Sequence, residues 1–229
     1  MMKKYSLLSV LSIFVFTLQP IYAYRYDMHL KGGISQSYGK IKGLEDSEDL
    51  SHGTGFNTHF GYKSKYFEFN LSSYIHWGEM EDLRFRSRGE EITGEGQWRN
   101  VSFGPTVKYQ FRGVQPVKNW FMYLSTGPMW SLQTVKFDEF ESTGPLFNAD
   151  QKLTYESYGG SFSIGFEEDL PYKEMHQVFI ELNYSYMKTY KVRSVDKSDF
   201  AETNILSEEE SKQDFSGHFF TVSLGMTIF

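Results

Sequence analysis

Two residues near the end of the chain are of the types that hydrolytic enzymes use. Ser216 and His218 could supply a nucleophile and a general base, and an acidic residue nearby could orient the histidine. At an outer lipid interface, such a group would be typical of an enzyme that hydrolyses lipid A. A serine and a histidine two positions apart in a strand often occur by chance. We therefore predict no catalytic site and no enzyme activity, and we keep a lipid A-modifying hydrolase as the third alternative.

Metal binding is the next chemistry to consider, because His29, His59 and His76 share one face of three consecutive predicted strands. A two-residue turn at 64–65 would pair His59 with Asn70, which leaves His59 about six residues, or ~20 Å, from His76. Bonds of ~2 Å from all three rings to one ion are incompatible with that separation. We expect neither a metal site nor a cofactor. The chain also contains no cysteine, so disulfides and thiolate ligands play no part.

Charged residues at inward positions predict a polar cluster inside the fold. In the predicted register, Glu68 lies opposite Lys108 on the adjacent strand, and Tyr123 follows on the strand after that. The other charged residues expected at this inward cluster are Lys31, Glu167 and Glu181. Buried charges of opposite sign are expected to pair, because an unpaired buried charge strongly destabilises the fold. We expect a satisfied structural network here rather than an ion gate.

A third group of charges consists of arginines in a predicted external loop. Arg84, Arg86 and Arg88 alternate with Leu83, Phe85 and Ser87, a pattern that could extend the preceding strand outward. Three guanidinium groups on one edge would suit the phosphates of lipopolysaccharide, because arginine offers paired donors. The acidic residues nearby could instead neutralise them. A contact with phosphate or lipopolysaccharide is therefore a hypothesis for these three residues.

The elements that must position these groups are read from period-2 alternation. Eight strands are predicted, at about 25–42, 54–63, 66–78, 97–111, 120–134, 154–167, 177–190 and 216–229. The connections between them alternate long and short, as in an outer-membrane barrel with external loops and periplasmic turns. Gly104-Pro105 and Gly127-Pro128 lie at similar depth on neighbouring strands, and we predict a shared bulge or local bend there.

The last strand shows most clearly that the sheet has two different faces. The apolar residues at alternate positions are Phe220, Val222, Leu224, Met226 and Ile228, and those between them are Thr221, Ser223, Gly225 and Thr227. Apolar side chains outside and polar ones inside are the reverse of a soluble ligand-binding barrel. The aromatic content of 18% suits membrane-interface girdles. Residues 1–23 have the basic start, apolar stretch and small-residue end of a signal peptide, and 24–229 are assigned to the barrel.

The residues 223–229, SLGMTIF, resemble the barrel-assembly signal of small eight-stranded outer-membrane barrels of the OmpA, OmpX and OmpW type. The resemblance covers about Tyr24 to Phe229, although Thr227 stands where the family usually has a large apolar or aromatic residue. It implies an all-β, eight-stranded, antiparallel, up-and-down transmembrane barrel in the bacterial outer membrane. It also implies engagement of the barrel-assembly machinery.

An eight-stranded barrel is only wide enough for its own inward side chains, so size argues against an open pore. We expect a monomer with a polar, plugged lumen and a structural or surface-interaction role through its external loops. The expected partners are outer-membrane lipid, lipopolysaccharide and an unidentified external ligand, and not nucleic acid. The second alternative is a narrow passage for small or hydrophobic solutes, as the resemblance to OmpW-type proteins implies.

Overall fold

The computed structural model describes residues 28–41, 51–64, 66–87, 89–111, 113, 115–144, 152–168, 177–195, 202–203 and 216–228. The regular elements of this part are strands: β1 (Met28–Ile41), β2 (Ser51–Lys63), β3 (Phe67–Ser87), β4 (Glu90–Phe111), β5 (Trp120–Ser142), β6 (Lys152–Glu168), β7 (Val178–Val195), β8 (Glu202–Thr203) and β9 (Ser216–Thr227). Within these ranges, no helix is long and apolar enough to cross a membrane. The predicted signal segment 1–23 and the terminal Phe229 lie outside the described residues.

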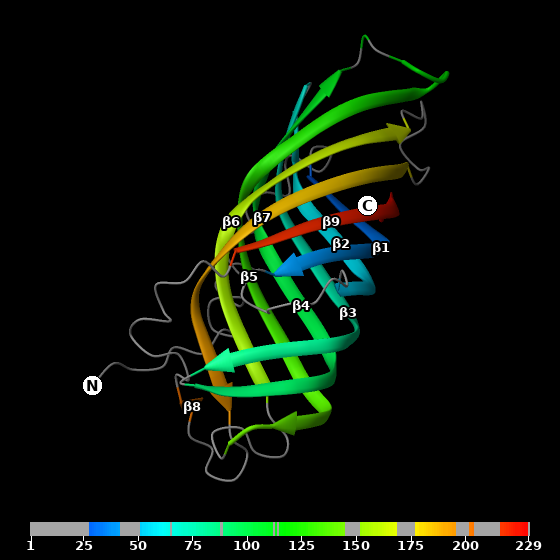
Figure 1. Cartoon of the computed structure of the whole chain (residues 1–229). Coiled ribbons are helices and arrows are strands. Elements are labelled where there is room, and N and C mark those ends of the chain that lie inside the picture. The colour runs from blue at the N-terminus through cyan, green and yellow to red at the C-terminus, as the bar shows by residue number, and fades with distance from the viewer. Residues whose placement is uncertain are drawn as a thin grey trace, which may run out of the picture.

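Eight of the strands close into an antiparallel ring, which confirms the predicted fold class (Figure 1). Each strand from β1 to β7 pairs with its neighbour in sequence, and β9 joins β7 to β1. The two-residue β8 pairs only with the outer end of β7. Closure leaves no free sheet edge within the ring, so the backbone hydrogen bonds are satisfied between strands.

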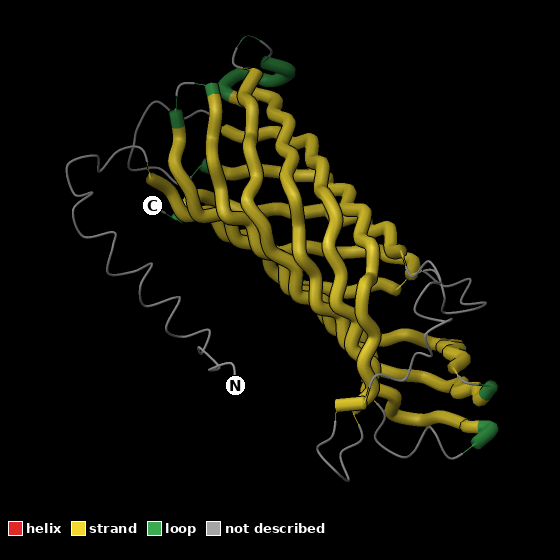
Figure 2. The backbone as a smooth tube through the Cα atoms, turned by 90° about the vertical axis from the view of Figure 1, so that its left-hand side faces the viewer, coloured by secondary structure: helices red, strands yellow, loops and turns green. Residues whose placement is uncertain are grey.

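The ring is staggered as well as closed. Followed from Met28 through successive paired residues of each strand, the path returns to β1 at Tyr38, ten residues further along. This stagger tilts the strands against the barrel axis, as Figure 2 shows. An eight-stranded ring leaves an interior that side chains fill.

The two faces of the sheet separate as predicted. On β9, the outward residues Phe220, Leu224 and Met226 are 49–56% exposed, whereas Thr221 and Ser223 are buried. The same alternation holds on the other ring strands. Exposed aromatic and aliphatic side chains cover the outside, and serine, threonine, asparagine and charged side chains are buried within. The pattern is thus that of a barrel turned inside out relative to a soluble one.

Several strands are longer than predicted, and this corrects the expected second external loop. β3 continues to Ser87 and β4 begins at Glu90, so most of the predicted loop 79–96 is a paired hairpin. Gly89 closes its turn with a φ of +83°, a conformation that glycine adopts without strain. β5 and β7 also run on, to Ser142 and Val195. Figure 2 shows the extended strands leaving the ring at one end as arms that bend away from it.

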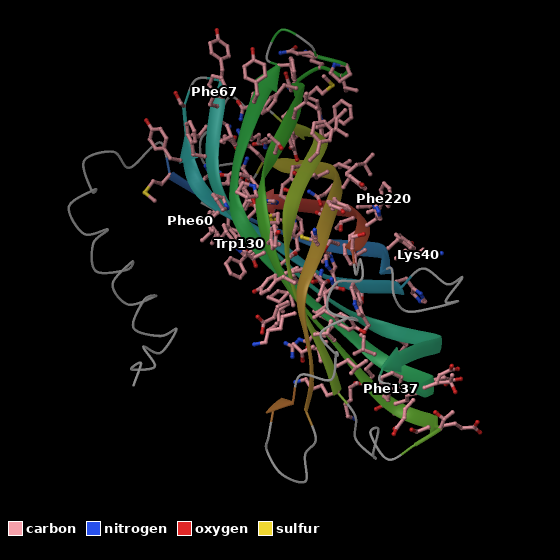
Figure 3. All side chains as sticks on the ribbon, turned by 60° about the vertical axis from the view of Figure 1, so that its left-hand side comes forward. Lys40, Phe60, Phe67, Trp130, Phe137 and Phe220 are labelled. Atoms are coloured by element: carbon pink, nitrogen blue, oxygen red, sulfur yellow. The ribbon has the colours of Figure 1, made fainter. Side chains whose placement is uncertain are left out.

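The interior has two sections, and this corrects the expectation that it is polar throughout. Toward the extended end it holds a buried apolar cluster of Tyr74, Ile92, Trp98, Met129, Val135, Phe137, Leu153, Tyr155, Met187, Val192 and Phe219. The rings of Trp98 and Phe219 stack with centroids 6.3 Å apart. Several of these residues, such as Ile92, Val135 and Phe137, fall in segments predicted to be loops. Figure 3 shows Phe137 at this end and Phe67 at the end with the short connections.

One register prediction is wrong, and of the bulge or bend predicted at the glycine–proline pairs, the bulge is absent. His59 pairs with Ser72 rather than Asn70, because the β2–β3 turn is two residues longer and Lys63 pairs with Glu68. A shift of two keeps every side chain on its predicted face. At the glycine–proline pairs, the β4–β5 ladder is interrupted between Phe103↔Trp130 and Val107↔Thr126 without any register shift. The strands therefore do not bulge there, and the missing pairing reflects the prolines, which have no N–H to donate.

Candidate functional site in the barrel interior

The polar section of the interior is organised around a cluster of buried charges, the lumen charge cluster, formed by Lys31, Lys63, Glu68, Lys108 and Glu167. The ammonium of Lys31 lies 2.9 Å from Glu68 Oε2 and 2.8 Å from Glu167 Oε2. Lys108 forms a short contact with Glu167 and lies 3.5 Å from Glu68. The side chains of Glu68 and Glu167 are 0% exposed, and that of Lys31 is 3% exposed. Two carboxylates thus share two fully buried ammonium groups.

The register of the ring explains why these residues meet. Glu68 pairs with Lys108 across β3 and β4, as the sequence predicts, and Lys63 pairs with Glu68 across β2 and β3. Lys31 on β1 and Glu167 on β6 reach the same region from across the ring. The ammonium of Lys63 lies 3.6 Å from Glu68 and 3.7 Å from Glu167, but its side chain is 23% exposed. Lys63 therefore lies at the edge of the cluster.

Glu181 lies beside this cluster and has different partners. Its carboxylate accepts hydrogen bonds from Tyr74 Oη at 2.9 Å and from Tyr123 Oη at 3.1 Å. The link to the cluster is the Tyr123 ring, whose centroid is 3.5 Å from Lys108 Nζ. Glu181 has different partners because it lies at a different level of the barrel: Glu167 pairs with Phe179, and Glu181 is two residues further along β7. Among the described residues, Glu181 therefore belongs to the polar section through hydrogen bonds that it accepts from two phenols.

The Tyr74 hydroxyl should contribute measurably to stability. We expect Tyr74→Phe to lower the free energy of unfolding by about 1–2 kcal/mol, because a buried carboxylate loses a donor and keeps one from Tyr123. The matched control is Tyr190→Phe, which removes an exposed hydrogen bond to Glu156 and should change stability by less than about 0.5 kcal/mol. Urea unfolding measures both. Equal effects of the two variants would contradict a buried role for Tyr74.

The three interior histidines are held apart, each by its own partners. His29 Nε2 lies 2.9 Å from Asn70 Oδ1, His59 Nδ1 lies 2.9 Å from Ser72 Oγ, and His76 Nε2 lies 2.9 Å from Ser35 Oγ. Across the described ranges, no group of three His, Asp or Glu residues could hold a metal ion.

Ser216 and His218 do not form a hydrogen-bonded pair. His218 Nδ1 lies 2.8 Å from the Tyr184 hydroxyl, and the buried Ser216 Oγ has no hydrogen-bond partner among the described residues. The histidine is thus engaged with an aromatic residue of β7 and not with the serine. This geometry gives the predicted lipid A-hydrolase alternative no support.

The arginine group is only partly described. The backbone of Arg84 and Arg86 lies in β3, where these residues pair with Thr93 and Glu91 of β4, and Arg88 lies outside the described residues. The strand extension expected from their alternation is therefore present. Arg84 lies seven residues beyond the exposed Trp77, which corresponds to ~23 Å along the strand. A phosphate contact by these residues stays a prediction.

Two residues of the polar section were not identified from the sequence. Gln110 donates a short hydrogen bond to Glu68, and Lys63 faces both carboxylates. Gln110 follows Thr106 and Lys108 at the same inward spacing, so strict alternation could have identified it. Lys63 could not be placed in this way, because its position depends on the length of the turn that follows it.

Comparisons with known proteins find similar solved structures among outer-membrane barrels. Neisserial surface protein A is 12% identical with a TM-score of 0.48 and covers 87% of this chain and 95% of its own. OprG of Pseudomonas aeruginosa is 14% identical with a TM-score of 0.47 and covers 88% and 94%. The outer membrane protease OmpT of Escherichia coli is 8% identical with a TM-score of 0.37 and covers 88% and 96%. No family model and no curated protein matches the sequence. At these identities and scores, the likeness carries no inference about function.

Proposed function

We propose that this protein is an integral barrel of the bacterial outer membrane with a structural or surface-interaction role and a closed lumen. The observation that carries the proposal is the reversed polarity of a closed eight-stranded ring. A belt of exposed side chains such as Phe69, Leu182 and Leu224 would be unfavourable in water. It is what a bilayer requires around a barrel whose backbone hydrogen bonds are satisfied within the sheet.

The closed lumen follows from the way the interior is filled. The lumen charge cluster occupies the end with the short connections, and the apolar cluster occupies the extended end. Large side chains, among them Trp98, Tyr123 and Phe121, are buried inside the ring in these sections. A hydrated ion path would need these groups to separate. We therefore assign the molecule's interactions to its outside surface and its extended strands.

The extended strands support surface interaction as the role. β3, β4, β5, β6 and β7 continue beyond the region where β1 and β9 pair, and residues of their extensions such as Ile92, Phe137 and Leu153 belong to the buried apolar cluster. An external platform of this kind could present the segments between the strands to a ligand outside the cell. The backbone of Arg84 and Arg86 lies in the extended part of β3, and contact of lipopolysaccharide with the arginines at 84, 86 and 88 is part of the proposal.

The decisive experiment is reconstitution of the purified chain into planar bilayers. We expect the chain to insert, and a heat-dependent shift in electrophoretic mobility reports the inserted barrel. Across the planar bilayer, we expect no ion conductance above that of the protein-free bilayer. Insertion with a stable unitary conductance would contradict the closed lumen. Failure to enter any bilayer would contradict the membrane assignment itself.

A second candidate function, passage of small hydrophobic solutes through the barrel wall, is supported by one specific feature. A depression of about 960 Å³ on the outside lies where the β4–β5 ladder is interrupted, and Leu71, Pro105, Val107 and Pro128 are among its lining residues. Uptake of a hydrophobic dye by liposomes that contain the protein, without ion conductance, would favour this candidate over the first.

A further inference from the structure

Two lysines face outward just beyond the apolar belt. Lys40 on β1 follows Tyr38 by two positions, and Lys188 on β7 follows Tyr186 by two positions. All four side chains are exposed, and Figure 3 shows Lys40 on the outside of the barrel near Phe220. We call the surface defined by Lys40 and Lys188 the lysine rim.

The pairing of the strands brings the two lysines onto one stretch of the wall. Lys40 pairs with His218 of β9, His218 pairs with Tyr186 of β7, and Lys188 lies two residues beyond Tyr186. With neighbouring strands ~4.8 Å apart and ~3.3 Å per residue, the two lysine Cα atoms are roughly 12 Å apart. Two long, flexible side chains at this distance can reach one headgroup between them.

Aromatic residues lie beside the two lysines and on the strand between them. The His218 ring lies 5.1 Å from the Tyr186 ring and is hydrogen-bonded to the Tyr184 hydroxyl. On the other side, Lys188 pairs with Tyr158, whose ring lies 5.8 Å from that of Tyr190. Tyrosines of this kind mark the level of the headgroups at a bilayer surface, and their hydroxyls can donate to phosphate.

The lysine rim carries positive charge that described carboxylates do not neutralise. Within the described ranges, no ion pair involves Lys40 or Lys188. The acidic group on the neighbouring part of β6, Glu156, accepts a hydrogen bond from Tyr190 at 3.1 Å. Two ammonium groups at an aromatic interface are complementary to a phosphorylated lipid, whose acyl chains would lie along the apolar wall below.

The leaflet follows from the direction of the strands. The lysine rim lies at the end opposite the β2–β3 turn, where β1 ends and β9 begins. In outer-membrane barrels, short turns face the periplasm, so this end meets the outer leaflet. We propose that the lysine rim binds the phosphate groups of a lipid A-type glycolipid in that leaflet, an inference that rests on the membrane assignment proposed above.

The test compares unfolding in phosphatidylcholine vesicles with and without bisphosphorylated lipid A. We expect lipid A to raise the urea midpoint of the wild type, and dephosphorylated lipid A or inorganic phosphate in the buffer to leave it unchanged. In Lys40→Gln/Lys188→Gln, most of that increase should be lost, since each lysine is expected to strengthen attraction to the anionic lipid about fivefold. The control Lys118→Gln, at an exposed position in the connection between β4 and β5, should retain the full increase.

Each other outcome overturns a distinct part of the proposal. An equal increase in the wild type and the double variant would show that the lysine rim is not the site. An equal increase with inorganic phosphate would refute a lipid source, and one with dephosphorylated lipid A would refute recognition of phosphate. A chain that does not enter any of the vesicles would instead refute the membrane assignment.

Discussion

Replacing Lys108 with methionine is expected to lower the free energy of unfolding by about 3–5 kcal/mol, because it leaves buried carboxylates short of a counter-charge. The Lys108 side chain is 5% exposed, and its ammonium lies close to both Glu167 and Glu68. Without it, the two carboxylates share Lys31 and the partly exposed Lys63. Reversible urea unfolding in lipid vesicles, followed by tryptophan fluorescence, measures the loss.

The compensating variants distinguish lost charge balance from lost packing. Glu167→Gln or Glu68→Gln, each combined with Lys108→Met, should be less destabilised than Lys108→Met alone, because each double variant retains one carboxylate paired with Lys31. Recovery should be larger with Glu167→Gln, since Glu167 is the nearer partner of Lys108. Lys118→Met, at an exposed position, serves as the control and should change stability by no more than about 0.5 kcal/mol. Double variants as unstable as the single one, or more so, would refute the network.

Leu182→Arg is expected to destabilise the protein in lipid vesicles by about 2–4 kcal/mol, because the arginine would face the middle of the bilayer. Leu182 is 54% exposed and lies on the outward face of β7, four residues after Val178, where the strand begins, and six before Lys188. If water surrounded this position, the same change would cost no more than about 0.5 kcal/mol. The sign and size of the effect therefore report which solvent the wall meets.

The matched control for Leu182→Arg is another exposed position on the same face of the same strand. Tyr190 is 58% exposed and lies eight residues further along β7, beyond Lys188. At this outer level, Tyr190→Arg should cost only about 0–1 kcal/mol. Unfolding from the same vesicles, followed by the heat-dependent shift in electrophoretic mobility, compares the two. If Leu182→Arg costs no more than Tyr190→Arg, the outward wall does not face lipid.

The alternation of residue types was sufficient to predict the wall and the polar part of the interior. Side chains of successive strand residues point to opposite faces, so the faces of Phe220, Ser223 and Leu224 could be read directly from the chain. The pairing of Glu68 with Lys108 could be predicted as well, although the hairpin that joins them is longer than expected. The register predicted for β3 and β4 within the membrane is correct, and a longer hairpin beyond the membrane does not change the pairing of Glu68 with Lys108.

Strand length and contacts across the ring could not be predicted in the same way. The predicted strand 120–134 ends at Thr134, but β5 continues to Ser142, and its residues Val135 and Phe137 are buried in one cluster with residues of other strands, such as Ile92 and Leu153. These partners are distant in sequence, and alternation contains no information about them. The bounds of the extended strands and the apolar section of the interior therefore required the folded chain.

The order of residue types along each strand is a local property, and it was enough to define an eight-stranded antiparallel barrel with an apolar outside and a polar inner face. Which charges meet depends instead on the closure and stagger of the whole ring. Lys31 on β1 forms an ion pair across the lumen with Glu167 on β6. Glu181 lies on the neighbouring strand β7, two residues beyond the residue that pairs with Glu167, and it contacts tyrosines instead. Closure also brings Lys40 and Lys188 to the same stretch of wall through β9. These contacts join residues from distant parts of the chain, so only the tertiary structure could reveal them.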